Sequence, residues 1–201
     1  MVEQTYDTDR VFTIPNLLSM LRLLGVPVFL WLVLGPRADL IAVAVLAFGG
    51  FTDWLDGHLA RKWHQTSRLG QLLDPIADRL YILATLLGLA FRAIIPWWLV
   101  ALLVARDVML GCLVPALKSR GYTSLPVHFL GKAATFSLLY AFPLVLLGAD
   151  PGEWAVVAKV AGWAFAIWGS ALYWYAGLLY VGQTAQLLRK QSPAEIEGAK
   201  R

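Results

Sequence analysis

The sequence predicts an all-α, polytopic membrane protein with six transmembrane helices. Hydrophobic residues make up 59% of the chain and charged residues only 15%, an apolar share above that of soluble domains. Apolar runs, each near the roughly 20 residues that cross a bilayer as a helix, alternate with short polar turns. Because no internal linker is found, we expect one six-helix domain over residues 14–188, between a polar N-terminal segment (1–13) and a polar tail (189–201).

The first half of the chain contains three predicted spans. They cover residues 14–34, 39–63 and 69–91. Pro15 suits the first turn of a helix, where its missing N–H costs nothing, and the first span ends at Gly35 and Pro36. Arg22 is the exception in this apolar run, and it either extends toward the membrane interface or faces a functional site.

The second half contains three more predicted spans. They cover residues 97–117, 131–147 and about 154 to 181 or beyond, the last ending in Arg189 and Lys190. Trp97 and Trp98 are typical of the membrane interface, and a turn at residues 150–152 precedes the last span. We interpret the aromatic segment from Tyr173 to Tyr180 as membrane packing rather than a ligand site.

Six spans place both termini on one side of the membrane. The loops on that side hold Arg61, Lys62, Arg68, Lys118 and Arg120, with Lys132 at their edge and Arg189 and Lys190 in the tail. The opposite loops hold only Arg37 and Arg92, so the positive-inside rule predicts that both termini face the cytoplasm of a cell membrane. The net charge of +4 is small and dispersed, which argues against a nucleic-acid partner.

Four carboxylates stand out at the end of the second span and the start of the third. They are Asp53, Asp56, Asp74 and Asp78. Each pair is three or four residues apart and therefore shares one helical face. Small residues accompany them, namely Gly57, Ala60 and Gly70, and small residues let another helix or a ligand approach closely. Two such helices facing each other at the cytoplasmic side would bring the four carboxylates together.

This acidic group predicts a metal site. A carboxylate near hydrocarbon costs roughly 2.5–3.5 kcal/mol even on a mild insertion scale, so four of them need positive charge close by. Oxygen-only ligands, without His or Cys at ligand spacing, favour Mg²⁺ or Mn²⁺. Four acids suffice for two ions, the usual arrangement for displacement at phosphorus.

The acids belong to a longer pattern, D-x₂-D-G-x₂-A-R-x₈-G-x₃-D-x₃-D, which the chain follows without a departure in spacing. The residues that carry it are Asp53, Asp56, Gly57, Ala60, Arg61, Gly70, Asp74 and Asp78. Eight fixed residues within 26 positions make the match specific. The chain therefore resembles the CDP-alcohol phosphatidyltransferases, whose signature this is.

The resemblance extends from Thr13 to about Arg189. The segments TIPNLLSMLRLLGVP, RDVML and LGKAATF are similar to the cardiolipin synthases of the CDP-alcohol type, found in mitochondria and actinobacteria. Phosphatidylglycerophosphate synthases come next, and they typically have Arg-Glu where this chain has Arg106 and Asp107. The resemblance implies transfer of a phosphatidyl group from CDP-diacylglycerol to phosphatidylglycerol with release of CMP, or alternatively to glycerol 3-phosphate, by a homodimer in the bilayer.

The resemblance also implies roles for single residues. Asp53, Asp56 and Asp74 would be the main ligands of one Mg²⁺ or Mn²⁺ ion. Asp78 would help to hold the second ion and would act as general base for the acceptor hydroxyl. The residues expected to bind the CDP group are Asn16, Asp53, Gly57, Ala60, Arg61 and Gly70.

Basic residues remain beyond those that CDP requires, so the acceptor is expected to carry an anion of its own. The residues expected to bind its phosphate are Arg106, Lys132 and Arg120. Arg106 could instead form a structural ion pair, although Asp107 points about 100° away on a helix and is a poor candidate for its partner. Lys132 could instead be an interfacial lysine.

A transporter is the rival hypothesis from another class, because intramembrane acids and an arginine also mark ion pathways. A transporter needs acids near mid-membrane and often has repeated halves. Here the acids gather at one predicted membrane face and the motif occurs once. Metal-dependent CMP release would separate the two classes.

Overall fold

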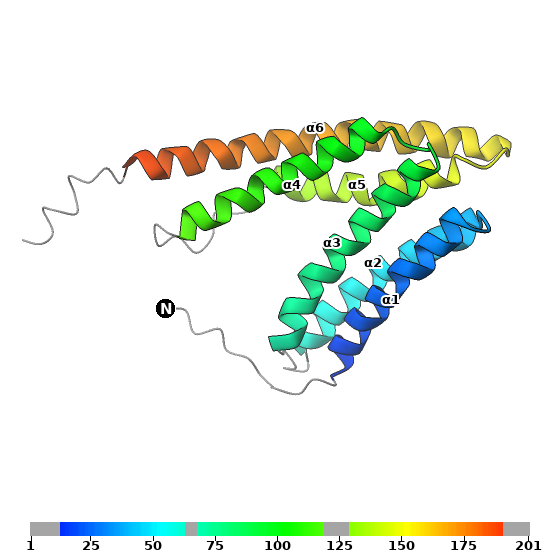
Figure 1. Cartoon of the computed structure of the whole chain (residues 1–201), viewed down its shortest axis with the longest axis horizontal. Helices are drawn as coiled ribbons and strands as arrows, with labels where there is room; N and C mark the ends of the chain where they lie inside the picture. The colour runs from blue at the N-terminus through cyan, green and yellow to red at the C-terminus, as the bar shows by residue number, and fades with distance from the viewer. Residues whose placement is uncertain (1–12, 63–67, 119–128, 191–201) are drawn as a thin grey trace, which may run out of the picture. The chain divides into compact units, whose positions relative to one another are not determined.

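The computed structural model describes residues 13–62, 68–118 and 129–190, and each regular element within them is an α-helix (Figure 1). The helices are α1 (Ile14–Leu34), α2 (Asp39–Lys62), α3 (Arg68–Phe91), α4 (Trp97–Lys118), α5 (Phe129–Leu147) and α6 (Glu153–Lys190). The predicted all-α class is therefore confirmed for the described part of the chain. The expected polar N-terminal segment lies almost entirely outside it, as does the tail from residue 191 onward.

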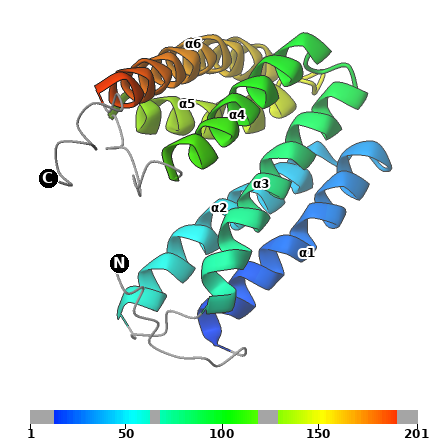
Figure 2. The same ribbon diagram turned by 60° about the vertical axis from the view of Figure 1, so that its left-hand side comes forward.

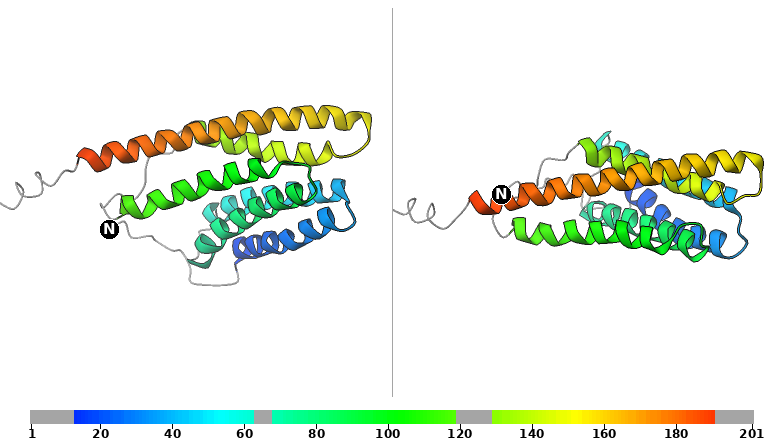
Figure 3. Two further views of the ribbon diagram at one scale, coloured as in Figure 1. Left: turned by 45° about the horizontal axis from the view of Figure 1, so that its top comes forward. Right: turned by 90° about the horizontal axis from the view of Figure 1, so that it is seen from above.

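The helices form two compact units. The first unit contains α1, α2 and α3 together with the end of α5, the turn after it and the start of α6 (Val145–Lys159). The second unit contains α4, most of α5 and most of α6. Within the first unit α1, α2 and α3 run side by side (Figure 2), and within the second unit α5 lies along α6 (Figure 3).

Local signals fix the ends of α1. The Thr13 hydroxyl oxygen accepts a hydrogen bond from the backbone N–H of Asn16 at 3.3 Å, which caps the first turn. Pro15 occupies that first turn, as predicted, and the chain leaves the helix at Gly35, whose N–H donates to the Trp31 carbonyl at 2.9 Å. The cap holds the start of α1, where Asn16 lies, in a defined position.

A close approach between α2 and α3 lies one turn from the acidic residues. The Tyr81 hydroxyl donates to the backbone carbonyl of Val45 at 2.7 Å, and Gly49 is buried against the same ring. A Cβ atom on Gly49 would lie 2.5 Å from the Tyr81 hydroxyl oxygen. Because Gly49 precedes Asp53 by one turn and Tyr81 follows Asp78 by one turn, this contact sets the register of the two acidic helices.

We expect Gly49→Ala to destabilise the protein by about 1–3 kcal/mol, the usual cost of overpacking, because the Tyr81 ring would have to move. Gly50→Ala is the matched control, since a Cβ atom there meets nothing within 4 Å. That control should be neutral or up to about 1 kcal/mol more stable, as alanine favours a helix over glycine. Denaturation in detergent measures both variants, and equal stabilities would contradict the assigned register.

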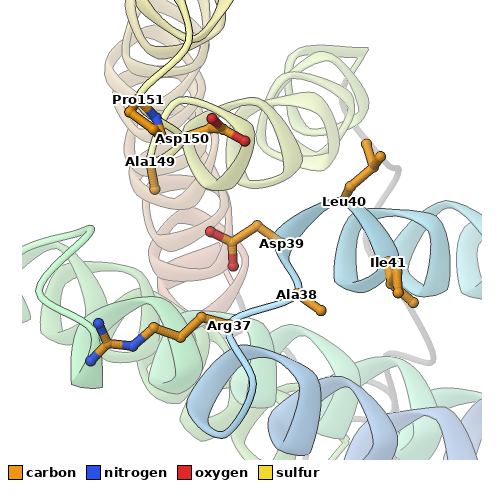
Figure 4. A pocket seen from close by; sticks show the side chains of 8 residues that line it. All are labelled: Arg37, Ala38, Asp39, Leu40, Ile41, Ala149, Asp150 and Pro151. Atoms are coloured by element: carbon orange, nitrogen blue, oxygen red, sulfur yellow. The ribbon is translucent and has the colours of Figure 1, made fainter.

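An ion pair and a hollow lie at the other end of α2. Arg92 binds Asp39 through two hydrogen bonds, one of them 3.0 Å from Nη2 to Oδ2, and both side chains are largely buried. The hollow is lined by residues 37–41 and 149–151 (Figure 4). It contains Asp39, whose charge Arg92 already neutralises, and it lies at the start of α2, whereas Asp53 and Asp56 lie toward the end of that helix. The hollow is therefore distinct from the acidic region.

Three described helical segments are long and apolar enough to cross a membrane. They are Asn16–Leu34, Phe129–Leu147 and Glu153–Gln186. Several spans in one chain of this composition are typical of an integral membrane protein.

Candidate active site

One face of α1 carries polar residues in an otherwise apolar helix. Asn16, Ser19 and Arg22 follow each other at intervals of three residues and so lie on the same face. Their exposed fractions are only 1%, 2% and 3%. Burial of three polar side chains in a row requires partners on the helices packed against α1, which are α2 and α3.

Arg22 finds those partners in the acidic residues. Its Nη1 lies 2.7 Å from Oδ1 of Asp53 and 2.5 Å from Oδ1 of Asp78, and its Nη2 lies 2.5 Å from Oδ2 of Asp56. Ser19 donates a long hydrogen bond of 3.5 Å to the same Asp56 oxygen. We call Asp53, Asp56 and Asp78 with Arg22 the acid cluster, and it joins α1, α2 and α3.

The acid cluster combines buried and accessible charges. The side chains of Arg22 and Asp56 are 2% and 4% exposed, whereas those of Asp53 and Asp78 are 49% and 47% exposed. The acid cluster by itself, three carboxylates and one guanidinium, has a formal charge of −2. The buried side chains of Arg22 and Asp56 thus pair with each other, and the half-exposed carboxylates of Asp53 and Asp78 can attract a further cation.

The donor atoms suit Mg²⁺ or Mn²⁺, since they are all carboxylate oxygens. Among the described residues, however, no three acidic, histidine or cysteine side chains form a group that could hold a metal ion directly. The described carboxylates converge on Arg22 instead. The side chain of Asp74, the fourth predicted ligand, lies outside the described residues.

The remaining predicted site residues are placed to different extents. Gly57, Ala60 and Arg61 lie on α2 and Gly70 on α3, but their side-chain environments are outside the described residues. Arg120 lies outside the described residues altogether. Lys132 is exposed near the start of α5.

Arg106 is buried in the second unit, 8% exposed, and it contradicts one prediction. Its Nη1 donates to Oδ1 of Asp107 at 3.2 Å, so the neighbour predicted to be a poor partner does pair with it. The reason is that the Tyr173 hydroxyl also donates to this Asp107 oxygen, at 2.6 Å, while the long arginine side chain turns back toward it. Tyr173 therefore has a polar role besides packing.

The family model of the CDP-alcohol phosphatidyltransferases matches residues 12–168, well over half of the chain. This chain belongs to the CDP-alcohol phosphatidyltransferase family. The matched region of this transferase includes the acid cluster and Arg106, but it ends before Tyr173.

Similar proteins carry the names of two activities. The transferase is 56% identical over 198 residues to the cardiolipin synthase (CMP-forming) of Streptomyces coelicolor, with 96% of this chain and 92% of the relative covered. It is 43% identical to a putative cardiolipin synthase of Mycobacterium tuberculosis, covering 94% and 90% of the two chains. It is 31% identical to a CDP-diacylglycerol–glycerol-3-phosphate 3-phosphatidyltransferase of Pectobacterium atrosepticum, covering 76% and 91%.

Sequence reasoning missed Ser19 and Tyr173 and left two roles open for Arg22. The available signal was the polar stripe on α1, where Asn16, Ser19 and Arg22 recur every three residues within an apolar run. For Tyr173 no local signal exists, because its partners Arg106 and Asp107 precede it by more than 60 residues.

Proposed function

We propose that this protein is a cardiolipin synthase that transfers the phosphatidyl group of CDP-diacylglycerol to phosphatidylglycerol and releases CMP. The observation that carries the proposal is the 56% identity, over nearly the whole chain, to a CMP-forming cardiolipin synthase. Glycerol 3-phosphate is the second candidate acceptor, because a transferase named for that acceptor is 31% identical. The difference in identity favours phosphatidylglycerol.

The donor site is proposed to lie at the acid cluster. Asp53, Asp56, Asp74 and Asp78 would hold two Mg²⁺ or Mn²⁺ ions, which when bound neutralise the pyrophosphate oxygens and the leaving CMP. The excess negative charge of the acid cluster and the exposure of Asp53 and Asp78 support this assignment. The residues proposed to bind the CDP group are Asn16, Asp53, Gly57, Ala60, Arg61 and Gly70.

Asp78 is proposed as the general base. Its carboxylate would take the proton of the acceptor hydroxyl while the hydroxyl oxygen attacks the β-phosphorus, the phosphorus attached to the lipid alcohol. A new phosphorus–oxygen bond forms to the acceptor, and the bond from the β-phosphorus to CMP breaks. The half-exposed side chain of Asp78 makes it accessible to an incoming hydroxyl.

The acceptor phosphate is proposed to bind Arg106, Lys132 and Arg120. A buried guanidinium suits a phosphate because it offers several N–H groups in a planar fork. Arg106 already donates to the Tyr173 carbonyl and to Asp107, and these two bonds leave part of the fork for a ligand.

The proposed setting is a cell membrane crossed six times, with both termini and the acid cluster at the cytoplasmic side. The three apolar helical segments support membrane insertion, and the distribution of basic residues supports the orientation. A homodimer is proposed by resemblance to the family.

The proposed function is tested by offering each acceptor separately to the purified protein with CDP-diacylglycerol and Mg²⁺. Mass spectrometry should find cardiolipin with phosphatidylglycerol as acceptor and little phosphatidylglycerophosphate with glycerol 3-phosphate. If phosphatidylglycerophosphate is the main product, the acceptor is glycerol 3-phosphate instead of phosphatidylglycerol, and the proposed donor site is unaffected.

Removal of divalent metal should stop the reaction. In EDTA we expect CMP release to fall by at least about a hundredfold, because the charge on the leaving CMP is no longer neutralised. Excess Mg²⁺ or Mn²⁺ should restore it. CMP release that persists in EDTA would contradict the proposed donor site.

A further inference from the structure

Arg22 makes two kinds of ion pair in the acid cluster, and they differ in exposure. Its Nη2 lies 2.5 Å from Oδ2 of Asp56, and these two side chains are only 2% and 4% exposed. Its Nη1 lies 2.7 Å from Oδ1 of Asp53 and 2.5 Å from Oδ1 of Asp78, whose side chains are about half exposed. A small ion can therefore reach Asp53 and Asp78, whereas the pair with Asp56 is closed to it.

A single nitrogen of Arg22 joins carboxylates of two helices. Asp53 lies on α2 and Asp78 on α3, and one oxygen of each lies within hydrogen-bond distance of the same Nη1. Mg²⁺ binds carboxylate oxygens at about 2.0–2.1 Å, so these oxygens would have to move by less than about 1 Å to hold an ion in place of that nitrogen. An ion that bridges the same two oxygens and the Nη1 contacts exclude each other.

The guanidinium has another way to satisfy its donors. The Nε of Arg22 is buried and has no hydrogen-bond partner among the described residues. A buried N–H without an acceptor costs about 1–3 kcal/mol. In a guanidinium, Nε–H and one N–H of Nη2 point the same way and can bind a carboxylate through two parallel hydrogen bonds. Since Nη2 already contacts Asp56, a tilt that releases Nη1 would bring Nε toward the same carboxylate.

We propose that Arg22 is an internal counter-cation of the acid cluster and that a divalent ion exchanges with it. When Mg²⁺ or Mn²⁺ binds between Asp53 and Asp78, Nη1 leaves both carboxylates and Arg22 pairs with Asp56 alone. This inference rests on the proposed function, in which the acidic residues hold metal ions. Arg22 then stabilises the first unit before an ion binds, and it weakens ion binding by competing for the same oxygens.

The test measures Mn²⁺ binding to the full-length protein in detergent, without lipid substrates, by calorimetric titration. Arg22→Gln should lower the Kd for Mn²⁺ about tenfold, which lies within the usual range of coupling between two ligands. Arg22→Lys keeps the positive charge but not the planar fork that reaches three carboxylates. Its Kd should lie between those of the unmodified protein and Arg22→Gln. Turnover is not the readout, because both substitutions also disturb the buried partner of Asp56.

The same exchange should appear in the stability of the protein, because coupling between two ligands is reciprocal. Relative to EDTA, Mn²⁺ should raise the Tm of Arg22→Gln more than the Tm of the unmodified protein. Arg92→Gln is the control, since it breaks the buried pair with Asp39 at the other end of α2. It should leave both the Kd for Mn²⁺ and the rise in Tm unchanged. If Arg22→Gln does not fold, the Kd of Arg22→Lys decides.

The possible outcomes separate this inference from the proposed function. If the unmodified protein binds Mn²⁺ and the Arg22 variants bind it equally or more weakly, the exchange is overturned and the proposed donor site stands. If the unmodified protein does not bind Mn²⁺, the proposed donor site fails first and the inference fails with it. The products formed with each acceptor test the rest of the proposed function independently.

Discussion

Asp78→Asn should abolish turnover while the protein still binds CDP-diacylglycerol. The amide cannot accept the proton of the acceptor hydroxyl, and loss of a general base costs about 10²–10⁴ in rate. The amide oxygen can still accept from Arg22, which lies 2.5 Å from Asp78 in the acid cluster, so the helices should keep their positions. CMP release measures the turnover, and calorimetric titration in detergent with Mg²⁺ measures donor binding.

Asp150→Asn is the control for this substitution. Asp150 is exposed in the turn before α6, and an asparagine there can still accept from the N–H of Gly152. Turnover of this control should equal that of the unmodified protein. A fully active Asp78→Asn enzyme would refute the assignment of Asp78 as the base.

Arg22→Gln should destabilise the first unit strongly. It leaves Asp56, nearly fully buried, beside Asp53 and Asp78 without the shared guanidinium. Breaking a buried ion pair typically costs 3–5 kcal/mol, and we expect about 3 kcal/mol because two of the three carboxylates are half-exposed. Chemical denaturation in detergent measures the loss, and turnover should fall because the acid cluster loses its geometry.

Two variants make this prediction specific. Arg92→Gln breaks a second largely buried arginine–aspartate pair among the described residues of the first unit, with Asp39, and should lower stability without changing turnover. Adding Asp56→Asn to Arg22→Gln should recover part of the lost stability, since the buried charge is then removed as well. Additive losses in the double variant would show that Arg22 and Asp56 do not interact.

The ends of a helix could be predicted from the sequence where residues that start or stop helices stand at both ends. The first span was predicted at residues 14–34 and is found as Ile14–Leu34, because Thr13, Pro15 and Gly35 mark its ends. The last span was predicted to run from about residue 154 to 181 or beyond and to end in Arg189 and Lys190, and α6 does end at Lys190. The apolar pattern fades after residue 181, yet no proline interrupts the helix before residue 190.

The acid cluster was predictable in part. Spacing alone placed Asp53 with Asp56 on one helical face, and the structure brings Asp78 to them through Arg22. Which way Arg22 points depends on how α1 packs against α2 and α3, and periodicity does not determine this. The prediction that Asp107 is a poor partner for Arg106 was wrong, because helical angles describe Cβ directions, whereas a long side chain can turn back when a distant residue such as Tyr173 holds its partner.

The measurement that tests the central claim most directly traces both halves of the product. Purified protein is given Mg²⁺, CDP-diacylglycerol and phosphatidylglycerol whose acyl chains differ in mass, and the cardiolipin and CMP are quantified together. Transfer from the CDP-lipid predicts cardiolipin with one pair of acyl chains from each substrate and one CMP for each molecule formed. Cardiolipin built only from phosphatidylglycerol chains, or formed without CMP, would contradict it.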